Sequence, residues 1–98
     1  MEAMPPLADP EISAALEALA GWTREGDEIV KIFDCGSFAA AIAFVVNVGF
    51  IAERADHHPD ILIHGWNNVR LTLSTHSAGA VTDADHALAG RIDALLGD

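Results

Sequence analysis

The chain has 98 residues, 51% of them hydrophobic and 20% charged, and its 15 acidic side chains against five Lys and Arg give a formal charge of −10. This length fits one domain over 1–98, with 1–8 as a flexible lead-in that lacks the pattern of a secretory signal. The charge opposes direct binding to nucleic acid or to an anionic membrane. A single cysteine, Cys35, forms no internal disulfide, so we expect a buried thiol in a reducing cytoplasm.

A first helix is predicted from the run Asp9-Pro10-Glu11. Asp9 can cap free backbone amides, Pro10 suits the first helical position, and Glu11 complements the positive end of the helix dipole. Gly21 supplies the stop. Between these signals, apolar residues recur at helical spacing and form one stripe: Ile12, Ala15, Leu16 and Leu19.

A hairpin is predicted next, with strands over 22–25 and 28–33 joined by a turn at Gly26-Asp27. The second strand is rich in β-branched residues. Trp22 at the start of this hairpin and Trp66 further along are expected to be core or rim aromatics at strand ends, although either could border a flat aromatic substrate.

An uncharged helix is predicted from a cap at Ser37 to about Arg54. We expect the chain to leave this helix near Asp56, because the residue before Pro59 resists helical angles. The stretch approaches the length of a membrane span, but its alanines, glycines and one asparagine lower its hydrophobicity. A helix buried on most of its circumference, under a sheet or between subunits, is the preferred interpretation.

A second hairpin is predicted, with strands over 61–63 and 69–75 around a turn at 65–68. If its centre lies near residue 67, antiparallel pairing sets Ile61 against Leu73. One step beyond the strand ends, the same register brings His58 close to His76.

The last helix is predicted from Thr82-Asp83-Ala84-Asp85, which resembles a capping box with Asp in the fourth place. Its expected core face consists of Leu88, Ile92, Leu95 and Leu96. The element order is therefore αββαββα, which implies an α+β fold with a four-stranded antiparallel sheet and helices packed on one face.

Three histidines are the candidates for chemistry: His57, His58 and His76. Imidazole is the side chain whose ordinary pKa lies nearest physiological pH, so a cluster of such rings suits proton transfer. Glu53 lies one helical turn before His57 and could orient it, while Asp85 could reach the same cleft. Histidines backed by carboxylates can donate one proton and accept another, as an elimination of water requires.

Other interpretations of these residues stay open. Adjacent histidines in a polar loop can be solvated surface residues, and neutral imidazoles near carboxylates can bind zinc. A zinc site is disfavoured because neighbouring residues in an extended segment point to opposite sides. A serine hydrolase would need a nucleophile elbow, which Ser74 and Ser77 do not supply. His64 and His86 are expected to be exposed polar residues.

The runs over 56–60, 72–76 and 82–85, with a hairpin between the first two, resemble the pterin-4a-carbinolamine dehydratases. The similarity spans roughly 22–95, and the combination of His-His-Pro-Asp with Ser-Thr-His is specific. It implies a small α+β protein that dehydrates 4a-hydroxytetrahydropterin to quinonoid dihydropterin, without metal or cofactor, in recycling of the cofactor of aromatic amino acid hydroxylases.

The resemblance also implies roles for individual positions. His57, His58 and His76 match the family's catalytic histidines, and Glu53 and Asp85 match its supporting acidic positions. The runs that match its pterin contacts are Asp56-His57-His58 and Ser74-Thr75-His76-Ser77. His58 and His76 are favoured for direct proton transfer, and His57 for binding or proton exchange.

The chain departs from the family pattern in a few places. The segment between His58 and His76 is one residue longer than in animal-type members, and a bulge near Gly65 would absorb the extra residue. Ala80 and Ser77 replace a frequent glycine and a frequent acidic residue. Some relatives stabilise dimers of a transcription factor, so a protein-binding module is the alternative function. The apolar helix and the sheet edge predict a homodimer or homotetramer.

Overall fold

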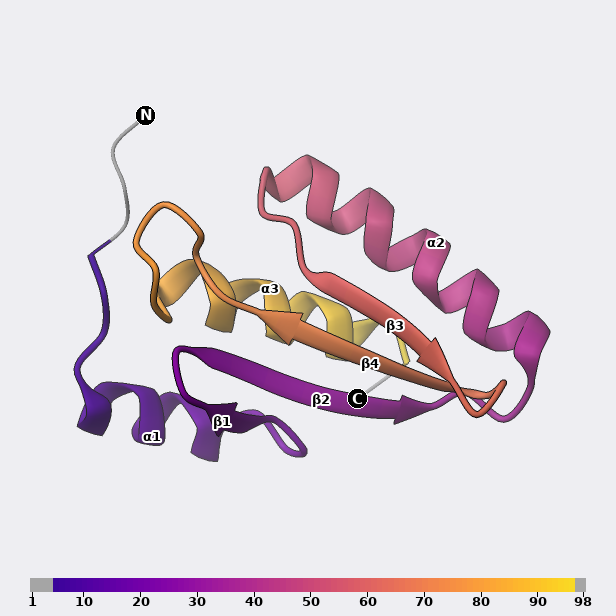
Figure 1. Ribbon diagram of the computed structural model, residues 1–98, viewed down its shortest axis with the longest axis horizontal. Helices are drawn as coiled ribbons and strands as arrows, with labels where there is room; N and C mark the ends of the chain where they lie inside the picture. Colours follow the sequence, from indigo (N-terminus) through magenta and orange to yellow (C-terminus); the bar gives the residue numbers. More distant parts are fainter. Residues whose placement is uncertain (1–4, 97–98) are drawn as a thin grey trace.

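Within residues 5–96, four antiparallel strands form one sheet in the order β1-β2-β4-β3 (Figure 1). In the computed structural model, which describes residues 5–96, the strands are β1 (Thr23–Glu25), β2 (Glu28–Asp34), β3 (Asp60–His64) and β4 (Asn68–Leu73). The two hairpins of the sequence, β1-β2 and β3-β4, thus lie side by side through the β2-β4 pair.

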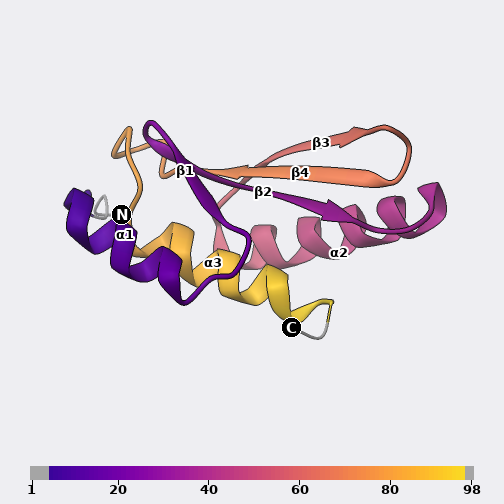
Figure 2. The same ribbon diagram turned by 90° about the horizontal axis from the view of Figure 1, so that it is seen from below.

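Within residues 5–96 the chain forms three helices, and Figure 2 shows that they lie on the same face of the sheet. They are α1 (Asp9–Glu17), α2 (Phe38–Ala55) and α3 (Asp83–Ala94). The predicted α+β class, the order αββαββα and the placement of the helices on one face are confirmed. In the predicted lead-in, residues 1–4 lie outside the described residues, and Leu7 donates its backbone N–H to the carbonyl of Val81 at 2.9 Å.

The register of the second hairpin differs from the prediction. Ile61 pairs with Leu71, not with Leu73, because the loop is the three residues between the pair His64 and Asn68. Side chains on a strand alternate with period two, so a shift of two positions keeps each of them on its expected face. The pairs run without interruption from Asp60 to His64, so the predicted bulge is wrong, and positive φ angles at Gly65 and Trp66 shape the turn instead.

The core lies between the inner face of the sheet and the helices. Alternate residues of the central strands point into it, because the pleat sends every second side chain to the same face. Rings from β2 and α2 meet there, with the centroids of Phe33 and Phe44 4.9 Å apart. The fully or nearly fully buried apolar side chains include Ile29, Phe33, Val69, Leu71, Leu73, Phe44, Val48, Leu88 and Ile92.

Trp22 and Trp66 have opposite environments. Trp22 is buried, packs edge-on against Phe33 and donates its indole N–H to Asp93 at 3.1 Å, so its core assignment is confirmed. Trp66 is exposed in the β3-β4 turn, where its backbone has a positive φ. The predicted core face of the last helix is also shorter than expected, because α3 ends at Ala94 and leaves the side chains that follow exposed: Leu95 and Leu96.

Two of the predicted helix caps form, those of Ser37 and Thr82, and the cap predicted at Asp9 does not. Ser37 accepts a hydrogen bond from the N–H of Ala40 at the start of α2, as predicted. At α1 the capping residue is Ala8, whose N–H is bound by the Glu11 carboxylate at 2.8 Å. Asp9 is instead the first helical residue and forms an ion pair with Arg24.

Helix α2 is buried on one face only, so the expectation of burial around most of its circumference is wrong for the single chain. Its buried residues are Ala41, Phe44, Val48 and Ala52, on the side toward the sheet. Its length and composition would allow it to cross a membrane, but a core helix of a water-soluble domain can pass the same test. A stripe of large apolar side chains on its other side is exposed: Phe38, Ile42, Val46 and Phe50.

Candidate active site

The carboxyl end of α2 delivers the histidine pair. Asp56 follows the last helical turn in the left-handed conformation, with φ 52° and ψ 42°, and the N–H of His57 returns to the carbonyl of Ala52 at 3.0 Å. His58 cannot continue the helix, because it precedes Pro59. The two imidazoles therefore leave the helix where β3 begins, as predicted.

His57 is held by a buried carboxylate from α3. Its Nε2 lies 2.6 Å from Oδ1 of Asp85, and the two side chains are 13% and 0% exposed. Because an ionised carboxylate only accepts hydrogen bonds, Nε2 donates the proton and Nδ1 remains as the second ring nitrogen. Asp85 thus fixes both the orientation and the tautomer of His57.

Two threonines complete the environment of Asp85. Its Oδ2 accepts from the hydroxyl of Thr75 at 3.0 Å and from the backbone N–H of Thr82 at 2.9 Å. The hydroxyl oxygens of Thr75 and Thr82 are 2.6 Å apart. Because Thr75 donates its hydroxyl proton to Asp85, Thr82 is the donor in this contact and Thr75 the acceptor. A buried carboxylate with every contact satisfied is rigid, which suits it to position a catalytic ring.

The second histidine forms an exposed pair of its own. Nε2 of His58 lies 2.7 Å from Oε1 of Glu53, and the two side chains are 59% and 78% exposed. The prediction that Glu53 orients His57 is therefore wrong. Glu53 stands on α2 beside His58, while His57 turns toward α3, because successive side chains after the helix end point in different directions.

His76 is placed by a tight turn after β4. Thr75 forms an isolated bridge with Ala80, and His76, Ser77 and Gly79 lie in the turn between them. Continued past the strand ends, the observed register would set His58 opposite residue 74, so the pairing argument that joined His58 to His76 is wrong by two residues. His76 is instead linked to the pair of His57 and Asp85 through Thr75, which directly precedes it in the chain and whose hydroxyl donates to Asp85.

The remaining predicted residues differ in exposure. Ser74 is half-buried and Thr75 is buried, whereas Asp56, His76 and Ser77 are exposed. Neither His64 nor His86 is the exposed polar residue expected, because both are half-buried and their Nε2 atoms lack a hydrogen-bond partner within the described residues. Between residues 5 and 96, no group of three His, Cys, Asp or Glu side chains is arranged to hold a metal ion.

One member of the site was not predicted. Thr82 is predicted only as a helix cap, yet its hydroxyl contacts Thr75 and its N–H donates to Asp85, in addition to the cap bond from the N–H of Ala84. The Thr-x-x-Asp pattern was the available signal, because the same carboxylate that closes a capping box can reach a third partner when it is buried. Asp85 therefore both caps the start of α3 and holds His57 in the candidate site.

Comparison with known proteins identifies the family. The model of the pterin 4 alpha carbinolamine dehydratase family matches residues 5–95. The chain belongs to this family. A relative in Roseiflexus castenholzii, provisionally named as a pterin-4-alpha-carbinolamine dehydratase, is 56% identical over 90 residues, which cover 92% of this chain and 96% of that protein. A relative in Chloroflexus aurantiacus with the same provisional name is 50% identical over 94 residues, which cover 96% of this chain and all of that one.

Solved structures agree with the family and broaden the range of roles within it. The transcriptional coactivator/pterin dehydratase from Brucella melitensis superposes with a TM-score of 0.87 at 34% identity, covering 92% of this chain and 97% of that chain. A pterin dehydratase-like protein identified as a RuBisCO assembly factor in the alpha-carboxysome superposes with a TM-score of 0.64 at 29% identity, covering 79% of this chain and 88% of that chain.

Proposed function

We propose that the protein is a 4a-hydroxytetrahydrobiopterin dehydratase, a hydro-lyase that converts pterin-4a-carbinolamine to quinonoid dihydropterin and water. The observation that carries this proposal is the buried contact between His57 and Asp85, because a carboxylate that fixes an imidazole is a recurring device of proton-transfer enzymes. Family membership supplies the substrate class. His58 directly follows His57, which contacts Asp85, and His76 directly follows Thr75, whose hydroxyl donates to Asp85.

The proposed reaction needs one proton donor and one proton acceptor. A protonated imidazole gives its proton to the 4a-hydroxyl as the C4a–O bond breaks, so that the group leaves as water. A neutral imidazole removes the N5 proton, and the N–H bonding pair forms the C4a=N5 bond. The proton added equals the proton removed, so the step is redox-neutral and needs no external reductant or oxidant.

We assign the direct steps to His58 and His76, and binding or proton exchange to His57. Both direct candidates are exposed, so their rings are accessible to a substrate, whereas the side chain of His57 is only 13% exposed and contacts the buried Asp85. Glu53 supports His58 through the 2.7 Å contact. The runs Asp56-His57-His58 and Ser74-Thr75-His76-Ser77 supply the pterin contacts in this proposal.

The decisive experiment is the decay of freshly generated carbinolamine, followed by stopped-flow absorbance with each histidine replaced by Ala. We expect His58→Ala and His76→Ala to lower the rate by about 10²- to 10⁴-fold, the usual contribution of general acid–base groups. His64→Ala is the matched control, because this ring lies next to the turn, at the opposite end of β3 from His58. A wild-type protein that leaves the decay at its spontaneous rate would refute the dehydratase proposal, and wild-type rates in all three single variants would refute the assignment of the histidines.

A protein-binding role without turnover is the second candidate. The observation in its favour is the exposed apolar stripe on α2, together with the assembly-factor function of the alpha-carboxysome neighbour. Turnover separates the two functions, because a pure interaction protein would leave the lifetime of the carbinolamine unchanged. A protein with both roles would lose only one of them when either the histidines or the stripe is altered.

We further propose that the chain forms a homodimer or homotetramer through α2 and the edge strand β3. The outer side of α2 is exposed, and β3 is an edge strand of the sheet within residues 5–96. Ile61 and Leu62 of β3 add exposed apolar area beside this free edge. We place the protein in the cytoplasm and in recycling of the tetrahydropterin used by an aromatic amino acid hydroxylase. Co-purification with pterin-dependent hydroxylase activity in the source cell tests that link.

A further inference from the structure

Two arginines at the junction of α2 and α3 differ from the other basic residues of the chain. Three of the five Lys and Arg side chains are neutralised by an acidic partner: Arg24 by Asp9, Lys31 by Asp93 and Arg70 by Glu25. The remaining two, Arg54 and Arg91, form no ion pair with any residue between 5 and 96. In a chain with 15 acidic residues, two cations that pair with none of the acidic residues in the described part of the chain are unexpected.

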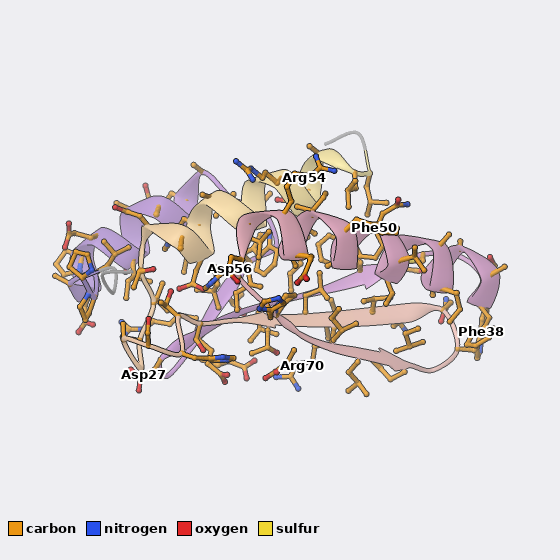
Figure 3. The ribbon with its side chains drawn as sticks, turned by 90° about the horizontal axis from the view of Figure 1, so that it is seen from above. Asp27, Phe38, Phe50, Arg54, Asp56 and Arg70 are labelled. Atoms are coloured by element: carbon orange, nitrogen blue, oxygen red, sulfur yellow. The ribbon has the colours of Figure 1, made fainter. Side chains whose placement is uncertain are left out.

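These two arginines line the same groove. One hollow of about 300 Å³ is bounded by Arg54, Arg91 and His57, with Ala84 and Ala87 of α3 in its wall. A second hollow of about 400 Å³ adjoins it and is bounded by the same two arginines with Ile51 and Ala94. Figure 3 shows Arg54 on the helix side of the sheet, opposite Arg70 on the other side.

The lining of the groove suits an anion. Among residues 5–96, no Asp or Glu lines either hollow, so no acidic side chain of this part of the chain compensates the two guanidinium groups there. The other lining residues are mostly alanines and aliphatic side chains, which cannot solvate a cation and which strengthen the field of the nearby charges. Guanidinium groups bind phosphate oxygens through paired hydrogen bonds, and two of them match the charge of a phosphate dianion.

We propose that this groove binds the phosphate group of a small molecule. His57 forms one end of it, so a phosphate there would lie beside the candidate active site. The group can come from two sources, a free phosphate ion or a phosphate ester on the side chain of a pterin. The second source rests on the proposed function, whereas the first does not.

The first arm of the test uses inorganic phosphate. Its addition to the ¹⁵N-labelled full chain, at constant ionic strength set with chloride, should shift the side-chain Nε–H signals of Arg54 and Arg91 and the amides of Ala84 and Ala87 in a saturable manner. Arg54→Gln and Arg91→Gln should each weaken binding roughly tenfold, the loss expected for one charge-assisted contact, and the double variant should abolish it.

The matched control is Arg70→Gln, which removes the same charge from the opposite side of the sheet and should leave phosphate binding unchanged. The second arm compares a reduced pterin that carries a side-chain phosphate with the same pterin lacking it. Tighter binding of the phosphorylated form, lost in the double variant, assigns the groove to the substrate. Equal pterin affinities with intact phosphate binding assign it to a free ion.

Two results would overturn the proposal. One is the absence of saturable shifts in the wild type, or shifts of the Ala84 and Ala87 amides that are of equal size in the wild type and the double variant. The other is a change of oligomeric state by light scattering in the double variant, with no phosphate binding by the wild type. In that case acidic residues of a second copy neutralise the arginines. Failure of the carbinolamine assay would remove only the pterin source, because the phosphate titration does not depend on turnover.

Discussion

His57 and Asp85 are 28 positions apart in the chain, yet Nε2 of the first lies 2.6 Å from Oδ1 of the second. This contact joins the end of α2 to the first turn of α3 and is shielded from solvent, in contrast to the exposed pair of His58 and Glu53. Two histidine–carboxylate pairs of similar length thus occupy opposite dielectric environments. A buried pair is expected to position its ring, whereas an exposed one contributes little.

The first prediction compares these two pairs. Asp85→Asn should slow carbinolamine dehydration at least about tenfold, because the amide can offer a donor to His57 and so favour the wrong tautomer. It should also lower the free energy of unfolding by about 1–3 kcal/mol, because a buried network is left partly unsatisfied. Glu53→Gln should change stability by less than about 1 kcal/mol. Urea unfolding and stopped-flow kinetics measure both, and equal effects of the two substitutions would contradict the assignment.

The second prediction concerns the hydroxyl that supports Asp85. Thr75→Val should cost about 1–3 kcal/mol of stability, because both Asp85 and Thr82 lose a buried partner. Thr75→Ser keeps the hydroxyl and should recover most of the activity lost in Thr75→Val. Rescue of the rate by serine separates positioning of Asp85 from loss of packing. A valine variant with unchanged stability would show that the hydroxyl network contributes nothing to folding.

The third prediction concerns the exposed stripe on α2, whose ends are labelled in Figure 3 as Phe38 and Phe50. Val46→Glu should dissociate the proposed assembly, because a carboxylate would have to be buried without a partner at an apolar contact. Ser13→Glu on exposed α1 adds the same charge elsewhere and should not. Multi-angle light scattering gives the masses, and a wild-type monomer would exclude this interface.

The fourth prediction compares the two faces of the sheet. Leu71→Ala should lower the free energy of unfolding by about 2–5 kcal/mol, because Leu71 is fully buried in the central strand. Leu62→Ala, on the exposed face of the adjacent strand, should change it by no more than about 0.5 kcal/mol in the monomer. Chemical denaturation at a protein concentration too low for association measures both. Comparable losses would show that the outer face is covered.

The fifth prediction concerns the single thiol. Burial, with a smaller contribution from the charge of Asp34, raises the pKa of Cys35 above its ordinary value. A raised pKa lowers the thiolate fraction at neutral pH, so iodoacetamide should alkylate Cys35 more slowly than a model thiol at pH 7. The difference should shrink as the pH rises above the pKa of Cys35. Mass spectrometry of timed samples measures the rate, and alkylation as fast as that of the model thiol would contradict the prediction.

Much of the fold was predictable because local signals agreed with it. The Ser37 cap, the exit of α2 before Pro59 and the Thr82 capping box each act within a few residues. The faces of β4 were also predictable, because alternation survives a shift of two residues. The hairpin register was not, because it depends on the backbone conformation of the turn, where Gly65 and Trp66 both take positive φ.

The amino-acid sequence by itself determined the order of the elements, the three candidate histidines and the family they resemble, because helix caps, strand alternation and short motifs are local patterns. Only the tertiary structure decided which carboxylate serves which histidine. Spacing along the chain favoured Glu53 for His57, yet the packing of α3 against α2 brings Asp85 there and leaves Glu53 to His58. Contacts between distant segments depend on how helices pack, and no pattern within either segment encodes that distance.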